Sequence, residues 1–275
     1  PCKLYKTVGA RYIWDLIVRT NYDHANPGVL YIDTIRRFDS SVIAINPCGE
    51  QPLPPYGSCL LGSINLCSFV TDTFDWDHYA AVVRAFTHVL DRVVDMHGLT
   101  GKWAETIENT RRHGMGYFGL GSCFNLLGMR YGSDESVAFT TRVTQVLANV
   151  GWAVGAELAA ERGACAGWSG GGAFHECLDE PVRDALDQYG SRFTHHGSIA
   201  PTGSIALAFG DNASGGIEPS FGHDYVRHIQ VEGERVKRAV RVLSHERRVL
   251  GSDPDEAPIT AVEHLRVQAA AQRYI

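Results

Sequence analysis

The chain has 275 residues, 44% of them hydrophobic, which is enough to bury the core of one large domain or two small ones. Its 25 basic and 31 acidic residues give a formal net charge of −6, which argues against a nucleic-acid-binding protein because such a protein normally has a basic face. No apolar run is long enough to cross a bilayer and the chain has no signal-like start, so we expect neither a membrane protein nor a secreted one.

The pattern of hydrophobic residues predicts alternating helices and strands. The predicted helices span about 10–25, 75–97, 118–127, 133–160, 182–189, 235–249 and 260–274. Short apolar runs predict buried strands at 29–32, 42–45 and 64–70, and 111–116 reads as a basic turn. Ser133 is the expected N-cap of the longest helix, with Glu135 in its first turn. Together these elements predict one α/β domain, or part of one.

The seven cysteines are few for a disulfide-stapled domain, odd in number and without a Cys-x-x-Cys pair, so we expect a reducing cytoplasm. A zinc site is a competing interpretation, because His175 and Cys177 lie near His195 and His196 in the sequence. No paired ligand spacing supports it, and the histidines at 113, 195 and 196 are expected to be structural or exposed to solvent.

The most informative run is Asn46-Pro47-Cys48-Gly49-Glu50, directly after a predicted strand. In extended backbone, residues two apart face the same side, so Asn46, Cys48 and Glu50 would converge on one bound molecule. A second cysteine, Cys59, follows across a stretch rich in proline and glycine. An amide, a thiol and a carboxylate on one face form a reactive set. The alternative is a surface loop with an unreactive, half-buried cysteine.

A second run, Pro201-Thr202-Gly203-Ser204-Ile205, predicts a phosphate cradle. Small, hydroxyl-bearing and glycine residues let successive backbone N–H groups point into one concavity, and the start of a helix there would attract an anion. An ordinary helix start remains the alternative. The glycine-rich loop 213–219 has no interpretation beyond a turn on its own residues.

These stretches together resemble the large, catalytic chain of ribonucleotide reductases. Residues 46–53, 56–59 and 61–66 are similar to the family's catalytic loop, 111–116 to its Arg-Arg-x-Gly-x-Gly segment, and 197–204 with 216–219 to its phosphate-binding loop and the loop after it. The short gap from Cys48 to Cys59 is closest to the adenosylcobalamin-dependent class II enzymes. The similarity runs along nearly the whole chain in the family's order.

The resemblance implies a fold and a function. Residues 1–275 would be part of a ten-stranded α/β barrel with the catalytic loop inserted in its centre, the upstream half and the C-terminal end of the barrel domain being missing. The enzyme would be an oxidoreductase that reduces ribonucleoside di- or triphosphates to 2′-deoxyribonucleotides for DNA synthesis, with adenosylcobalamin as cofactor.

The resemblance also implies a role for each site residue. Cys48 would become a thiyl radical and take the 3′ hydrogen of the ribonucleotide, and Glu50 would accept the proton of the 3′-hydroxyl. Asn46 would hydrogen-bond the sugar hydroxyls, and Cys59 would be one half of the dithiol that reduces the substrate. Residues Pro201, Thr202, Gly203, Ser204 and Ile205 would bind the substrate's phosphates.

The implied partners are a ribonucleotide, a thioredoxin-type or glutaredoxin-type reductant acting through tail cysteines outside this chain, and a second copy in a homodimer. Because the family's upstream half supplies the other cysteine of the dithiol, we expect this chain alone not to sustain turnover. Two alternatives stay open: a class I type large subunit served by a separate metal-containing radical subunit, and a non-catalytic nucleotide-binding remnant of the same fold. The segment 36–45, which is shorter than in most family members, is the best support for the remnant.

Overall fold

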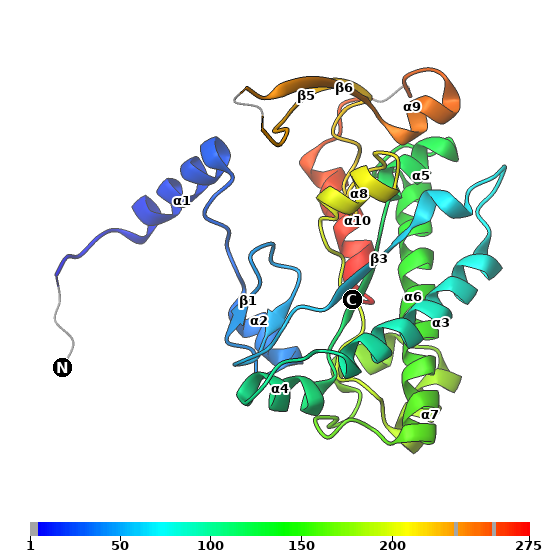
Figure 1. Ribbon diagram of the computed structural model, residues 1–275. Coiled ribbons are helices and arrows are strands. Elements are labelled where there is room, and N and C mark those ends of the chain that lie inside the picture. Colours follow the sequence, from blue (N-terminus) through cyan, green and yellow to red (C-terminus); the bar gives the residue numbers. More distant parts are fainter. Residues whose placement is uncertain (1–4, 234–235, 255–256) are drawn as a thin grey trace. The chain divides into compact units, whose positions relative to one another are not determined.

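The computed structural model describes residues 5–233, 236–254 and 257–275. The described residues fall into two compact units, one ending at Ser40 and one that begins at Ser41. Each unit is considered by itself. Figure 1 shows their helices and strands.

The first unit holds two helices, α1 (Ala10–His24) and α2 (Ile32–Phe38), and no residue of either helix is buried. The helix predicted over 10–25 is therefore confirmed. The strand predicted at 29–32 is wrong, because the chain enters α2 at Ile32. An acidic residue in the first turn of α2 and two arginines in its last turn match the helix dipole, which favours a helix over a short apolar strand there.

The second unit is mixed α/β. Its strands are β1 (Ala44–Ile45), β2 (Pro52–Leu53), β3 (Leu61–Asn65), β4 (Gly114–Phe118), β5 (Asp224–Ile229) and β6 (Arg238–Leu243). Its helices are η1 (Leu66–Phe69), α3 (Trp76–Asp95), α4 (Lys102–Thr110), α5 (Leu120–Leu126), α6 (Asp134–Arg162), η2 (Gly172–Cys177), α7 (Glu180–Tyr189), α8 (Gly203–Phe209), α9 (His245–Leu250) and α10 (Ala261–Gln272).

The centre of this unit is a parallel pairing of β3 with β4, in register from Leu61 opposite Gly114 to Asn65 opposite Phe118. A third segment runs parallel to β4 on its other side, through a bridge between Met115 and Gly197. The N–H of Met115 donates to the carbonyl of residue 196 at 2.7 Å, and the carbonyl of Met115 accepts from the N–H of residue 198 at 2.9 Å. These bonds hold three chain segments side by side.

The basic turn predicted at 111–116 is wrong in its second half, which is the start of β4. All five residues of β4 are buried. Its glycines suggested a turn, but they serve close packing: a Cβ at Gly116 would overlap the carbonyl oxygen of Ser198 and lie 3.0 Å from the Cα of Ile199. Glycine is therefore required in β4 by the neighbouring backbone.

The remaining strands form two antiparallel pairs, β1 with β2 and β5 with β6. Among the described residues the strands form three separate two-stranded sheets and no closed barrel. The helix predicted at 235–249 is wrong over β6, since residues 238–243 pair along their whole length with β5. The strand predicted at 64–70 ends at Asn65, whose Oδ1 accepts from the N–H of Cys67 at 3.1 Å and begins the 3-10 helix η1.

The helices pack around α6, with α3, α7 and α10 in contact with it (Figure 1). The predicted cap of α6 is confirmed: the Ser133 hydroxyl oxygen accepts from the N–H of Ser136 at 3.2 Å, and Glu135 lies in the first turn. The core between α3, α6 and β4 is aromatic, with Tyr79 and Tyr117 fully buried. Searched over the described residues, no helix is both long and apolar enough to span a bilayer.

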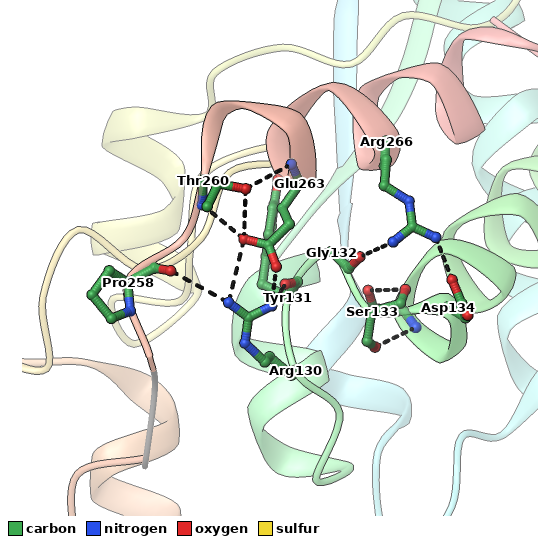
Figure 2. Close-up of polar contacts among 10 residues, drawn as sticks. Arg130, Tyr131, Gly132, Ser133, Asp134, Pro258, Thr260, Glu263 and Arg266 are labelled. Atoms are coloured by element: carbon green, nitrogen blue, oxygen red, sulfur yellow. Dashed lines mark hydrogen bonds and ion pairs between the residues drawn. The ribbon is translucent and has the colours of Figure 1, made fainter.

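The last helix is joined to the start of α6 by arginine contacts (Figure 2). Arg130 pairs with Glu263, which also closes a capping box with Thr260 at the start of α10. Arg266 donates to the carbonyl of Gly132 at 2.8 Å and pairs with the carboxylate at position 134. Hydrogen bonding from Arg130 and then from Thr260 lowers the pKa of Glu263 to about 2. The C-terminal helix is thus fixed to the central helix by charge as well as packing.

The close packing at β4 gives a stability prediction. Gly116→Ala forces a methyl group against the backbone of Ser198, which cannot move aside as a side chain could. We expect a loss of free energy of unfolding at the upper end of about 1–3 kcal/mol, measured by urea denaturation. Gly222→Ala is the matched control, because its Cβ would meet only a ring atom of Tyr225 at 3.7 Å. Equal stability of the two variants would contradict the packing argument.

Candidate active site

The run from Asn46 to Gln51 forms a tight turn between β1 and β2. The N–H of Gly49 donates to the carbonyl of Asn46 at 3.1 Å, and Gly49 has a φ of 88°. The Asn46 Oδ1 accepts from the N–H of Gly49 at 3.1 Å and from that of Gln51 at 2.9 Å. The prediction that an extended backbone aligns alternate residues is therefore wrong, because the Asn46 side chain captures two backbone N–H groups and closes the loop.

The turn nevertheless brings the four predicted residues into one neighbourhood. The Asn46 Nδ2 donates to the Cys59 Sγ at 3.8 Å. The pKa of Cys59 is raised, first by partial burial and then by the charges of Glu50 and Cys48. Both cysteines are free thiols exposed to solvent. The Cys59 thiol thus contacts the amide of Asn46, and the Glu50 carboxylate and the Cys48 thiol lie close enough to raise the pKa of Cys59.

Glu50 is held by its backbone while part of its side chain is left without a partner. Its carbonyl accepts from the Ser198 hydroxyl at 3.0 Å. Its Oε2 is buried, and no described residue donates a hydrogen bond to it. A buried carboxylate oxygen without a donor is costly, so this atom is suited to accept a hydrogen bond or a proton from a bound molecule.

Three residues that hold the loop in place were missed by sequence reasoning. Arg112 donates to the carbonyl of Pro52, Ser198 holds Glu50 as described, and Gln51 is 4% exposed beside Gly114. A Cβ at Gly114 would overlap the amide of Gln51, so glycine there makes room for it. All three lie in the motifs that drew attention to the chain, but nothing in the sequence says which atoms meet.

The predicted phosphate segment begins in an unusual conformation. Thr202 is buried with a φ of 55°, and its hydroxyl donates to the carbonyl of Pro201 at 2.8 Å and accepts from the N–H of Gly216 at 3.0 Å. Its side chain therefore does not cap α8. Gly203 and Ser204 are exposed, and nothing lies within 4 Å of a Cβ built at Gly203, so the first turn of α8 is open on that side.

The loop 213–219, which sequence reasoning left as a turn, supports that segment. Gly215 and Gly216 lie against the carbonyls of Pro201 and Ala200, where side chains would clash. The phosphate segment also follows directly on Ser198, which holds the carbonyl of Glu50. Residues 198–201 thus connect the phosphate segment, 201–205, with the turn 46–51, here called the thiol turn, because Ser198 holds the carbonyl of Glu50.

The three histidines singled out in the sequence, at positions 113, 195 and 196, pack against neighbouring side chains. His113 Nε2 and His196 Nδ1 are 3.0 Å apart, both rings are buried, and both contact Phe193. Burial lowers the pKa of His196 to about 4 and that of His113 as well, so both are neutral near pH 7. His195 contacts Arg112 and Thr194. Within the part of the chain that is described, no group of three or more His, Cys, Asp or Glu could hold a metal ion.

Comparison with known proteins adds a second line of observation. The family model described as "Ribonucleotide reductase, barrel domain" matches residues 2–272. A vitamin B12-dependent ribonucleoside-diphosphate reductase of Thermoplasma acidophilum is 31% identical over 262 residues, covering 92% of this chain and 32% of that protein. One named likewise from Mycobacterium tuberculosis strain CDC 1551 is 30% identical over 306 residues, covering 99% of this chain and 42% of that protein.

A third relative bears another name. The ribonucleoside-diphosphate reductase subunit alpha of Chlamydia pneumoniae is 28% identical over 262 residues, covering 82% of this chain and 25% of that protein. The chain therefore spans less than half the length of each of these three relatives.

The turn around Asn46 can be tested by substitution. Asn46→Ala removes the acceptor of the Gly49 and Gln51 N–H groups, so both amides should exchange with solvent faster. Asn46→Asp keeps a side-chain oxygen at the same place and is expected to keep most of the protection. Amide hydrogen exchange resolved by residue measures both variants. If the Gly49 and Gln51 amides of Asn46→Ala exchange as slowly as those of the unchanged protein, Asn46 does not close the loop.

The charge relation between Glu50 and Cys59 gives a pH prediction. A raised thiol pKa keeps Cys59 protonated to higher pH, so its alkylation by iodoacetamide should accelerate only above the range of an ordinary thiol. Glu50→Gln removes one negative charge and should shift that acceleration to lower pH, although partial burial keeps the pKa above its usual value. Glu105→Gln, on α4, is the control. A pKa of Cys59 unchanged by Glu50→Gln would contradict the arrangement.

Proposed function

The chain belongs to the ribonucleotide reductase family, and on that premise we propose that it provides the catalytic loop of an adenosylcobalamin-dependent reductase acting on ribonucleoside diphosphates. The observation that carries the proposal is the cluster itself: an exposed thiol, Cys48, and a carboxylate with a buried, unpartnered oxygen on one turn, with a second exposed thiol, Cys59, against the amide of Asn46. The printed names of the Thermoplasma and Mycobacterium relatives support the cofactor and the diphosphate substrate.

In the proposed reaction each residue has one task. Cys48, as a thiyl radical, takes the hydrogen atom from C3′ of the ribose, while Glu50 accepts the proton of the 3′-hydroxyl. Cys59 supplies one of the two thiols whose oxidation to a disulfide gives the substrate two electrons. The unpartnered Glu50 Oε2 supports the base role, and the exposure of both thiols supports access by the substrate and by the tail cysteines through which a thioredoxin-type or glutaredoxin-type reductant would act.

Only one of the two polar atoms of the Asn46 side chain is proposed to bind the substrate. Its Oδ1 already accepts two backbone N–H groups of the turn, so its Nδ2 is the group proposed to donate to a sugar hydroxyl. Asn46 would then both shape the loop and hold the sugar in register with the Cys48 sulfur.

The phosphates are proposed to bind at residues 201–205. The exposed first turn of α8 offers N–H groups beside the Ser204 hydroxyl, and the buried Thr202 keeps the segment's shape through the Gly216 N–H. Because this segment continues from Ser198, which holds Glu50, a nucleotide bound there would carry its ribose toward the thiol turn.

Adenosylcobalamin is proposed as the source of the radical. When bound, it supplies a carbon-centred radical by homolysis of its cobalt–carbon bond. The exposed position of Cys48 fits this group, since a bulky cofactor can approach the sulfur.

The finer architecture is likewise a proposal. Strand β3, strand β4 and the segment at Gly197 run parallel and side by side, which supports assigning them to one wall of a ten-stranded α/β barrel with the Asn46 turn at its centre. Residues 1–275 would then form part of the barrel domain of an enzyme that works as a homodimer in a reducing cytoplasm, where its thiols stay reduced.

A class I type large subunit is the second candidate, and the name of the Chlamydia relative favours it. The same loop chemistry would then depend on a radical from a separate metal-containing subunit. Turnover that requires added adenosylcobalamin, in the complete enzyme, supports the first proposal, and turnover without it supports the second.

The role of Cys48 is tested by Cys48→Ser in the complete enzyme. Serine has the same shape as cysteine with oxygen in place of sulfur, but its O–H bond is too strong for the hydroxyl to take the thiol's part. We expect turnover to disappear while nucleotide binding, measured by calorimetry, changes by less than about tenfold, or about 1.4 kcal/mol.

Cys177→Ser is the matched control, because Cys177 is half-buried in η2 and has no proposed role. It should leave turnover intact. A Cys48→Ser enzyme that turns over normally would remove Cys48 from the mechanism, and one that loses nucleotide binding as well would show a structural role instead.

A further inference from the structure

Cys48 and Cys59 differ from the other described cysteines in being exposed. Cys67, Cys123 and Cys165 are buried and Cys177 is half-buried. The family's scheme gives these two thiols separate partners: a substrate hydrogen for Cys48 and a third thiol for Cys59. In the fold, however, they occupy one neighbourhood.

Their proximity follows from Asn46. Its Nδ2 lies 3.8 Å from the Cys59 Sγ, and Cys48 is two residues further along the same turn. Two residues span at most roughly 7 Å between Cα atoms, so Cys48 lies on the same short turn as the amide that contacts the Cys59 sulfur. The charge of Cys48 also acts on Cys59, which agrees with a short separation.

The turn can close the remaining gap. A disulfide needs Cα atoms about 4.4–6.8 Å apart and sulfurs that face each other. Cys48 and Gly49 are exposed, so a shift of the tip of the turn breaks the hydrogen bonds of the Gly49 N–H to Asn46 but does not unbury the core.

We propose that Cys48 and Cys59 form a reversible disulfide with each other when the protein meets hydrogen peroxide. The Cys48 thiolate attacks one peroxide oxygen, which gives a sulfenic acid and hydroxide, and the hydroxide takes up the proton that Cys48 released. Cys59 then attacks the sulfenic sulfur and a second water leaves. Two thiols lose two protons and two electrons, and one peroxide becomes two waters. A dithiol reductant reverses the bond.

The bond would also inactivate the enzyme, and this consequence, unlike the bond itself, rests on the proposed function. A sulfur in a disulfide carries no hydrogen and cannot serve as the radical carrier. The oxidised form would therefore be an inactive state that protects Cys48 from irreversible oxidation to a sulfinic acid.

Peptide mapping tests the bond without any need for turnover. The folded 275-residue chain is treated with hydrogen peroxide, free thiols are blocked with iodoacetamide, and the unfolded protein is cut after glutamate. Cleavage after Glu50 separates Cys48 from Cys59, whereas trypsin has no site between Arg37 and Arg84. We expect a cross-linked pair of peptides, 1–50 with 51–105, that is lighter than the two reduced peptides by two hydrogen atoms, with fragmentation placing the link at Cys48 and not Cys2 in the first, and at Cys59 and not Cys67 in the second.

Two variants and a second readout complete the test. Cys177→Ser should keep the cross-link, and Cys59→Ser should abolish it and leave Cys48 as a sulfenic or sulfinic acid. A Cys59 bonded to any other cysteine, or both thiols alkylated after peroxide treatment, would overturn the proposal. In the complete enzyme, dithiothreitol should restore turnover lost to peroxide. Full turnover of the mapped disulfide form would instead count against the radical role of Cys48, not against the bond.

Discussion

The structure depends on the close approach of two backbone segments to β4, one on each of its sides. Strand β4 lies between β3 and the segment at Gly197, and a side chain at Gly116 would collide with the Ser198 carbonyl. That approach lets Ser198 reach the carbonyl of Glu50, and the lack of a side chain at Gly114 leaves room for Gln51. The thiol turn is therefore positioned by hydrogen bonds to and contacts with residues around β4, since the single pair of two-residue strands that flanks it, β1 and β2, would hold it only weakly.

Within the turn, one amide organises the chemistry. Asn46 uses its oxygen for the backbone of its own loop and its nitrogen for the sulfur of Cys59. Loop shape and thiol placement are thus coupled through a single side chain, which explains how four groups converge without an extended backbone. The same coupling places the two thiols near each other, so it bears both on the proposed catalysis and on the proposed disulfide.

Much of this could be predicted from the sequence, and the misses have definite causes. Helices α1, α3, α6, α7 and α10 have long apolar periodicity or clear caps, and these signals are local. Strand β4 was missed because glycine is rare in strands, and β6 because its arginines and alanine favour a helix. Pairing with a distant segment overrides that preference, and no local pattern reports it.

For the site, the sequence by itself determined the chemical groups: the Cys48 and Cys59 thiols, the Glu50 carboxylate and the small residues of 201–205, together with the family to which their motifs point. Only the tertiary structure decided that Asn46 folds the loop into a turn, that Ser198 holds Glu50, and that one oxygen of Glu50 is buried without a partner. The reason is physical. Residue types set what chemistry is possible, whereas burial, charge proximity and hydrogen-bond geometry depend on contacts that no residue type specifies, from the Gly49 bond to Asn46 within the turn to the Ser198 bond to Glu50 between distant segments.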